Sequence, residues 1–209
     1  MKIYTDLEQG SDAWIKLRKG KPTASRFSDI ITAAKGDKSK SAKPYMRELI
    51  GEAFCPDWEE WAGNKYTERG TETEPEAREA FASILDTERL EDTGFVLSDD
   101  GVSGCSPDGL IYQEDRLISG VEIKCPSPKL HIGYVLDGGL PLLYKAQVHG
   151  SMVVTGTDYW HFWSYFPGLR PHYIVVVRDE FTAKVEVAVA EFVHEYKAAY
   201  ADALPKLKF

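Results

Sequence analysis

The sequence predicts an α/β fold, in which a central mixed β-sheet is flanked by helices and preceded by a helical N-terminal segment. Three observations predict it. Apolar residues follow helical spacing up to about residue 90, short runs rich in β-branched and aromatic residues occupy about residues 91–178, and an amphipathic stretch covers about residues 180–204. With 209 residues, 43% of them apolar, the chain can bury a sizeable core, and we expect residues 1–209 to form a single domain.

Helix caps and apolar spacing predict the helices in order. Ser11 is a suitable N-cap for a helix that ends at Gly20, and Thr23 is a suitable cap for a second helix that runs to Gly36. The polar, lysine-rich segment that follows, residues 36–43, is expected to be mobile. The remaining helices are predicted over Pro44–Phe54, Glu68–Leu85, Leu142–Val154 and Phe181–Leu204.

Six strands are predicted from short apolar and aromatic runs that Gly, Pro and Asp residues bound. The predicted helix over Leu142–Val154 is expected to pack on the sheet that they form. The strands are predicted over Thr93–Leu97, Gly101–Cys105, Gly109–Tyr112, Ile118–Cys125, Tyr159–Phe166 and His172–Val177.

The formal charge of −8 argues against a nucleic-acid-binding protein until it is divided along the chain. Residues 1–50 carry 11 Lys and Arg against 6 Asp and Glu, whereas residues 51–116 carry 5 against 18. A basic N-terminal third suits contact with phosphates. The acidic middle third suits either solvent or a metal site.

Targeting segments and metal-binding cysteines are not indicated. The N-terminus lacks the apolar stretch of a signal peptide, and nowhere do about 18 apolar residues run together, so we expect a soluble cytoplasmic protein without a membrane partner. Cys55, Cys105 and Cys125 show no Cys-x-x-Cys spacing, and the five histidines show no metal spacing. Neither a disulfide framework nor a zinc site is predicted.

The strongest chemical signal is a pair of short segments, Ser-Pro-Asp-Gly around Asp108 and Val-Glu-Ile-Lys around Glu122. On a strand, Glu122 and Lys124 leave the same face while Ile123 points into the core, and Asp108 is expected from the neighbouring strand. Two carboxylates and a main-chain carbonyl such as that of Ile123 suit a hard divalent cation, and Lys124 is placed to position or deprotonate a water. Ordinary surface hairpins show the same spacing, so spacing alone leaves both interpretations open.

Five blocks of sequence carry a resemblance to a known family. The chain resembles the lambda exonuclease-like recombination (alkaline) exonucleases of bacteriophages, within the PD-(D/E)xK nuclease superfamily, over nearly its whole length. Each block alone is a weak pattern, but the five in order are specific. The resemblance implies a restriction-endonuclease-like core. The matching blocks are Ala13 to Gly20 with Thr23-Ala24-Ser25, Gly70 to Arg78, Cys105 to Leu110, Glu122 to Pro126, and Ala146-Gln147-Val148.

The resemblance implies a role for each active-site residue. Asp108 and Glu122 match the metal-binding acids, with Mg²⁺ as the expected cofactor and Mn²⁺ as a substitute. Lys124 matches the catalytic lysine. Glu74 matches a helix glutamate that completes the site through a water or a second metal, and Gln147 matches a glutamine that holds the nucleophile or a phosphate oxygen. Without the resemblance, Glu74 and Gln147 are ordinary helix-surface residues.

The resemblance also implies a pocket for a 5′-terminal phosphate. Arg18, Ser25 and Ser106 match its residues, and Thr23 is a further candidate, since a guanidinium and hydroxyls suit a phosphate dianion. One further basic residue of the family has no clean equivalent here. Lys129 is the nearest candidate, although a lysine offers a point charge where an arginine offers a fork.

Two aromatic signals leave alternatives open. Trp14 suits either the apolar side of an amphipathic helix, which is the commoner case, or a wedge at the end of a DNA duplex. His161, in the aromatic stretch 159–163, suits an alternating strand better than a stacking platform for bases.

Together these residues imply a Mg²⁺-dependent 5′→3′ exonuclease that digests one strand of duplex DNA from a 5′-phosphorylated end and leaves a 3′ single strand. The resemblance further implies a ring-shaped homotrimer, a single-strand annealing recombinase as partner, and a bacterial cell with the gene carried by phage, prophage or host. A restriction-like DNA endonuclease and a catalytically silent DNA-end-binding module stay open as alternatives. The presence of Asp108, Glu122 and Lys124 together argues against the silent module.

Overall fold

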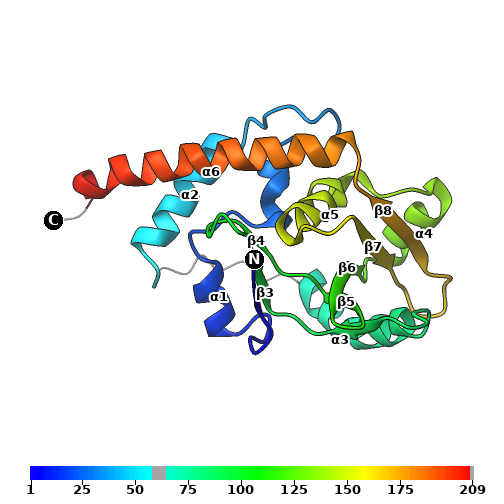
Figure 1. Cartoon of the computed structure of the whole chain (residues 1–209). Coiled ribbons are helices and arrows are strands. Elements are labelled where there is room, and N and C mark those ends of the chain that lie inside the picture. Colours follow the sequence, from blue (N-terminus) through cyan, green and yellow to red (C-terminus); the bar gives the residue numbers. More distant parts are fainter. Residues whose placement is uncertain (58–64, 208–209) are drawn as a thin grey trace.

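The structure, a computed structural model, describes residues 1–57 and 65–207, with side chains described for residues 1–57 and 72–207. The helices and strands can be followed along the chain in Figure 1. The elements are β1 (Lys2–Tyr4), α1 (Asp12–Arg18), the 3₁₀ helix η1 (Ala24–Asp29), α2 (Ala42–Phe54), α3 (Lys65–Ala82), β2 (Arg89–Glu91), β3 (Phe95–Leu97), β4 (Gly104–Cys105), β5 (Gly109–Gln113), β6 (Arg116–Lys124), α4 (Pro128–Asp137), α5 (Leu142–Thr155), β7 (Tyr159–Ser164), β8 (His172–Val177) and α6 (Glu180–Leu207).

Two sheets organise the chain. A five-stranded sheet has the order β2-β5-β6-β7-β8, and a three-stranded sheet has the order β1-β3-β4. Within the larger sheet β6 and β7 are parallel, whereas the other neighbours are antiparallel. A parallel pair needs a crossover connection, which α4 and α5 provide here. The predicted mixed sheet with flanking helices is therefore confirmed.

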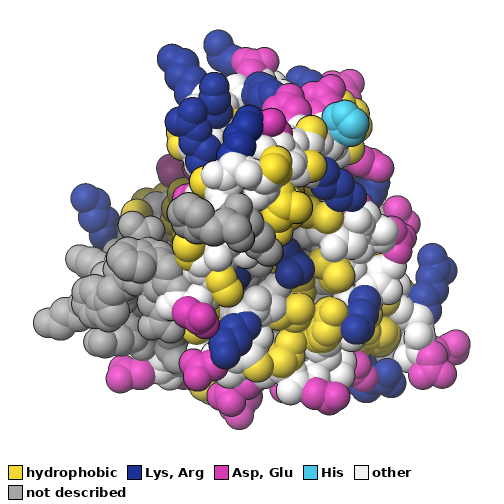
Figure 2. All heavy atoms as spheres, turned by 90° about the vertical axis from the view of Figure 1, so that its left-hand side faces the viewer, with side chains coloured by type: hydrophobic (Ala, Val, Ile, Leu, Met, Phe, Trp, Pro, Cys, Tyr) yellow, Lys and Arg dark blue, Asp and Glu magenta, His cyan; other side chains and the backbone are white. Residues whose placement is uncertain are grey.

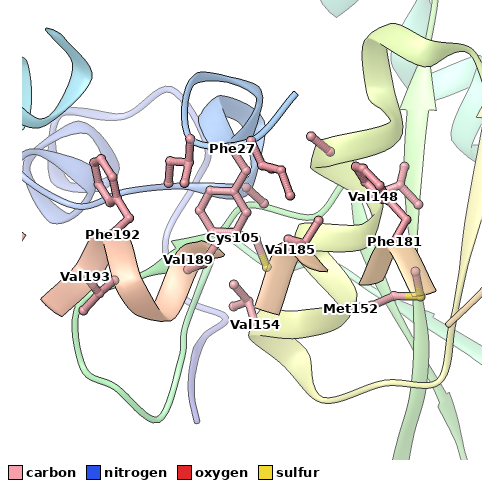
Figure 3. Close-up of a cluster of buried hydrophobic side chains, with 14 of the residues drawn as sticks. Phe27, Cys105, Val148, Met152, Val154, Phe181, Val185, Val189, Phe192 and Val193 are labelled. Atoms are coloured by element: carbon pink, nitrogen blue, oxygen red, sulfur yellow. The ribbon is translucent and has the colours of Figure 1, made fainter. Parts of the chain in front are cut away.

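Apolar side chains cover both faces of the five-stranded sheet. On one face α5 packs on the sheet, η1 and α6 pack against α5, and α2 packs against α6, in a shared core that includes Phe27 and Met152 (Figure 3). On the other face Phe81 of α3 packs with Ile123 of β6. Because successive residues of a strand alternate between faces, Glu122 lies on the α5 side while Ile123 lies on the α3 side. This alternation is the one predicted for β6.

The C-terminal helix α6 holds the N-terminal part of the chain in place. Tyr196 Oη donates to Gly20 O at 2.8 Å, at the end of the α1 region. Phe192 stacks on Tyr45 of α2 with ring centroids 5.7 Å apart. As Figure 1 shows, α6 runs past α2 and α5, so one helix contacts segments that lie far apart in the sequence.

Several elements differ from the prediction. The helix predicted from Thr23 to Gly36 is wrong, because only Ala24–Asp29 is helical and forms a 3₁₀ helix. The N-terminal part also contributes the short strands β1 and β2, which were not predicted. The helix α4 was missed although Pro128 stands at its first turn and Gly138 caps its end. The C-terminal helix extends to Leu207, three residues beyond the prediction.

The charge division of the sequence does not translate into one basic face on the side drawn in Figure 2. Basic and acidic side chains are intermixed there, with hydrophobic side chains exposed between them. Among the described helices, none is long and apolar enough to cross a membrane.

His161 of β7 is buried among aromatic rings. Its Nδ1 lies 2.9 Å from Tyr173 Oη, its ring stacks on that of Tyr173, and the ring of Phe81 packs edge-on with centroids 5.5 Å apart. The expected strand is confirmed, and His161 is part of its packed surface. Burial lowers the pKa of His161 to about 4.

We expect His161→Phe to reduce the loss of stability in acid. The folded-state pKa lies below the ordinary value, so the unfolded chain takes up the proton first, and stability is lost between about pH 6.5 and about pH 4. A shift of this size in the pKa of His161 corresponds to a change of roughly 3 kcal/mol in the free energy of unfolding. Urea unfolding at neutral pH and in mild acid measures the effect, with exposed His194→Asn as control. An equal pH dependence in wild type and His161→Phe would contradict it.

Candidate active site

Asp108 and Glu122 come together across the β5–β6 pair. Gly109 lies opposite Val121 in an antiparallel register, so Asp108 and Glu122, one step further along, stand opposite each other. The Asp108 N–H donates to Val121 O at 3.1 Å, and Asp108 Oδ2 accepts a hydrogen bond from the Ile123 N–H at 2.6 Å. The structure thus places Asp108 beside β6 as the sequence predicted.

The two carboxylate oxygens of Glu122 have different surroundings. Glu122 is 1% exposed, and its Oε1 accepts a hydrogen bond from Gln147 Nε2 at 2.6 Å and pairs with Lys124 Nζ. Its Oε2 is buried and has no hydrogen-bond partner among the described residues. Leaving a buried carboxylate oxygen unpartnered is costly, which indicates that Oε2 serves a group that the chain does not supply. The contact of Gln147 with Glu122 was not part of the sequence prediction.

Burial and crowding shift the pKa values of these groups. Burial, opposed by the charge of Lys124 and assisted by that of Asp108, raises the pKa of Glu122 to about 7. Burial also raises the pKa of Asp108, against the nearby Lys124. For Lys124, burial acts to lower the pKa, but the charges of Glu122 and Asp108 raise it above its usual value. Lys124 therefore stays an ammonium ion, and the crowded acids favour a further cation.

Helix α3 contributes to the site from the opposite face of the sheet. The pKa of Glu74 is raised, first by partial removal from water and then by the nearby Asp108. One turn later, Arg78 donates to the main-chain oxygen of Asp108 and pairs with Asp92 at 2.7 Å. The structure thus brings Glu74 within electrostatic reach of Asp108. Arg78 was missed as a site residue, although its i+4 spacing from Glu74 places both on one helix face.

Helix α5 places a second residue, Tyr144, beside Lys124. The ring centroid of Tyr144 lies 5.6 Å from Lys124 Nζ, within the range of a cation–π contact. Tyr134 of α4 packs edge-on against Tyr144, with centroids 6.1 Å apart. Sequence reasoning did not select Tyr144. Its i−3 spacing from Gln147 was the available signal, since residues three apart share a helix face.

The donor set of this cluster suits a hard divalent cation. The cluster offers oxygen atoms, the type of ligand that Mg²⁺ prefers: the unpartnered Glu122 Oε2, the second carboxylate oxygen of Asp108 and the main-chain carbonyl of Ile123. Within the described residues, no three His, Cys, Asp or Glu side chains gather closely enough to hold a metal by themselves. Two carboxylates with a carbonyl and water still suit Mg²⁺, because that ion retains several waters in most protein sites.

A second polar cluster surrounds the guanidinium of Arg18. Nη1 donates to Ser106 Oγ at 2.7 Å, and Nη2 donates to Ser25 Oγ at 3.3 Å and to Thr23 Oγ1 at 3.4 Å. A main-chain bridge between Thr23 and Gly104 joins the start of η1 to β4, which leads into Ser106. The structure therefore brings together four of the five residues predicted for a phosphate pocket, all except Lys129.

The charge of Arg18 is not neutralised by a direct carboxylate partner in the described part of the chain. Its hydrogen bonds there go to hydroxyl groups, and burial lowers its pKa from the usual value. An arginine still keeps its charge at neutral pH. A half-buried cation surrounded by hydroxyls is an environment that favours an anionic ligand.

Lys129 belongs neither to the carboxylate cluster nor to the hydroxyl cluster around Arg18. It lies exposed in the first turn of α4 and makes no hydrogen bond or ion pair with the residues that the structure describes. Its role in phosphate binding stays a prediction.

The sequence also matches a known protein family. Residues 13–158 match the family described as the YqaJ-like viral recombinase domain. The chain belongs to this family. Every predicted site residue, from Arg18 to Gln147, lies inside the matched segment of the YqaJ-like domain, whereas α6 lies beyond it.

Solved structures resemble the YqaJ-like domain along most of its length. An alkaline exonuclease from Laribacter hongkongensis aligns with a TM-score of 0.79 and 29% identity, over 94% of this chain and 97% of that one. The same exonuclease in complex with dAMP aligns with a TM-score of 0.73 and 28% identity, over 93% and 99% of the two chains. The predicted resemblance to the lambda exonuclease-like nucleases is confirmed.

A third structure supports the fold of the YqaJ-like domain. A phage related exonuclease from Haemophilus somnus 129PT aligns with a TM-score of 0.64 and 18% identity, over 93% of this chain and 99% of that one. A search of curated proteins gave no match.

Proposed function

We propose that the chain is a Mg²⁺-dependent exonuclease that digests one strand of double-stranded DNA in the 5′→3′ direction from a 5′-phosphorylated end. The remaining 3′ single strand would then serve recombination by annealing. Membership of the viral recombinase family and the likeness to an alkaline exonuclease at 29% identity support this activity.

One observation carries the proposal, namely the short connection between the two polar clusters. Ser106 belongs to the hydroxyl cluster around Arg18, and Asp108 belongs to the carboxylate cluster. Two residues of extended chain span about 7 Å at most, which is on the scale of a single nucleotide. An anion pocket this close to a cleavage site favours removal of one nucleotide at a time from a phosphorylated end.

The chemistry can be assigned to residues of this chain. A bound divalent cation would supply Lewis-acid chemistry, that is, polarisation of the phosphate and a lower pKa for a nearby water. Asp108 and Glu122 would hold it, and Gln147 fixes Glu122 by occupying Oε1 while Oε2 stays available. Lys124, kept charged by Glu122, orients the attacking water and stabilises negative charge on the phosphate oxygens.

The bond changes define the products. The water oxygen bonds to phosphorus, the bond from phosphorus to the 3′ oxygen breaks, and that 3′ oxygen takes up a proton. The released mononucleotide keeps its own 5′-phosphate, and the shortened strand carries a new one. The dAMP in the solved complex of the alkaline exonuclease is a mononucleotide of this chemical type.

The proposal is tested with three DNA substrates, each with Mg²⁺ and with chelator. Linear duplex with a labelled 5′-phosphate should release labelled mononucleotides, duplex with a 5′-hydroxyl should react more slowly, and closed-circular DNA should stay intact. A label at the 3′ end should be retained in the early products if the direction is 5′→3′. Cutting of the circle would favour an endonuclease, and no cleavage at all would favour a binding module.

We also propose a ring-shaped homotrimer in the bacterial cytoplasm, and a single-strand annealing protein as partner. The resemblance to the lambda exonuclease-like family supports both. Light scattering in solution should give three times the chain mass of 23.5 kDa. A monomer mass would contradict the ring.

We expect Arg18→Lys to weaken the preference for phosphorylated ends. A lysine cannot reach Ser106 on one side and Ser25 on the other with a rigid fork, so the pocket loses its arrangement. The ratio of kcat/KM between phosphorylated and hydroxyl ends should fall by roughly 10- to 100-fold, since hydrogen bonds to charged groups contribute about 1.5–3 kcal/mol. Lys19→Arg, a nearby reverse exchange, serves as control, and an unchanged ratio in Arg18→Lys would argue against this pocket.

A further inference from the structure

Trp14 of α1 lies against the phosphate pocket. Its Nε1 donates to Ser106 Oγ at 3.0 Å and to Gly94 O at 2.9 Å. Its ring lies 4.3 Å from the guanidinium carbon of Arg18, in cation–π contact. One half-buried side chain therefore contacts the cation, a hydroxyl and the main chain of this pocket. Neither a purely apolar core role nor a wedge against DNA accounts for these contacts.

The contact between Trp14 and Ser106 matters because a serine hydroxyl can accept only two hydrogen bonds. A serine hydroxyl has one proton to donate and two lone pairs that accept. Arg18 Nη1 occupies one lone pair at 2.7 Å, and Trp14 Nε1 occupies the other at 3.0 Å. The Ser106 proton therefore points away from both donors and needs an acceptor elsewhere.

The donors and acceptors of the other two hydroxyls, those of Thr23 and Ser25, can be counted in the same way. Thr23 Oγ1 and Ser25 Oγ lie 3.3 Å apart, and both also accept from Arg18. Only one of them can donate to the other, and the Thr23 side chain also hydrogen-bonds with Tyr45, so the Ser25 hydroxyl is the one that can turn its proton toward a ligand. The pocket thus presents donors from several sides, an arrangement that suits an oxyanion with several acceptor oxygens.

We propose that Trp14 is a positioning residue that sets the preference for a terminal phosphate by directing the Ser106 hydroxyl proton toward the ligand. The inference rests on the proposed function, in which the pocket binds a 5′-phosphate. Trp14 has no need to touch the DNA in this role. With the indole N–H removed, the Ser106 hydroxyl regains a free lone pair and rotates, so its proton is no longer directed.

The test compares two variants that separate the N–H from the ring. Trp14→Phe keeps an aromatic face over Arg18 and removes the donor, whereas Trp14→Leu removes both. The readout is the ratio of kcat/KM between 5′-phosphorylated and 5′-hydroxyl duplex, which partial unfolding does not change because it affects both substrates equally. We expect Trp14→Phe to lower this ratio roughly tenfold, mainly through KM, and Trp14→Leu to lower it at least as much.

Tyr4→Leu is the matched control. Tyr4 is a half-buried aromatic residue that packs on Phe95 in the same small sheet, and no contact joins it to Ser106 in the described structure. The ratio of kcat/KM between phosphorylated and hydroxyl ends should be the same in Tyr4→Leu as in wild type. An unchanged ratio in Trp14→Phe would overturn the inference, whereas a wild-type protein without any phosphate preference would instead overturn the proposed pocket.

A double-mutant cycle identifies the route of the effect. If Trp14 acts through the hydroxyl, Trp14→Phe should change the ratio less than about twofold in a Ser106→Ala background, because coupled residues are not additive. A tenfold fall in that background would show that Trp14 does not act by directing Ser106.

Discussion

Lys124→Ala is expected to lower the rate of DNA cleavage by on the order of 10²- to 10⁴-fold while the fold stays intact. The ammonium group pairs with the buried Glu122 and lies beside Tyr144, where it can orient water and stabilise charge. The side chain is only half-buried at the end of β6, so its truncation leaves the sheet ladder in place. Single-turnover release of nucleotides from phosphorylated duplex measures the effect.

Lys206→Ala is the control for this experiment. Lys206 is exposed near the end of α6 and pairs with Asp202, so its loss should leave the rate unchanged. Circular dichroism and thermal melting establish that Lys124→Ala is folded. Near-normal turnover by the folded Lys124→Ala variant would contradict the catalytic role proposed for Lys124.

Asp108→Asn is expected to abolish both cleavage and stabilisation by metal. Asparagine keeps an oxygen that can accept the Ile123 N–H, so the local turn is preserved while the ligand charge is lost. Activity should fall by more than about 100-fold, since even residues that only support metal ligands typically cost 10- to 100-fold. The free energy of unfolding of the wild type should rise by about 2.7 kcal/mol when Mg²⁺ or Mn²⁺ is at 100 times its Kd. That of Asp108→Asn should change little.

The metal readout does not depend on turnover. Melting temperatures with and without Mn²⁺ should separate wild type from Asp108→Asn, and exposed Asp158→Asn should behave as wild type. A melting temperature that rises equally in Asp108→Asn and wild type would place the cation elsewhere. If Asp108→Asn lost the rise in melting temperature with Mn²⁺ but kept its activity, the cation held by Asp108 would not be needed for cleavage.

The carboxylate cluster was largely predictable because it rests on local rules. The alternation of side chains along β6 places Glu122 and Lys124 on one face, and this follows from strand geometry alone. The Ser11 cap of α1 is equally local, and its side chain accepts from the Trp14 N–H as expected. The pairing of Asp108 with Glu122 needed only that neighbouring strands form a hairpin.

The phosphate pocket was not predictable from residue spacing. Ser106 and Arg18 are separated by 88 positions, and no periodicity links them. Their association depends on how the three-stranded sheet docks on η1, so only the family resemblance pointed to it. The missed strands have another cause, since β1 and β2 are three residues long and too short to show a pattern. The segment after Thr23 became a 3₁₀ turn because tertiary packing overrides weak helical preference.

The contact between Tyr196 and Gly20 has a consequence for how the protein matures during synthesis. A chain emerges from the ribosome N-terminus first, so the segment that carries Arg18 and Thr23 appears long before its brace on α6. The residues of the carboxylate cluster are all present once the chain reaches Gln147, but the segment that carries the proposed phosphate pocket gains the hydrogen bond from Tyr196 only near the end of translation. A nascent chain would thus contain every residue of the proposed catalytic site before the segment with the proposed phosphate pocket is held by α6.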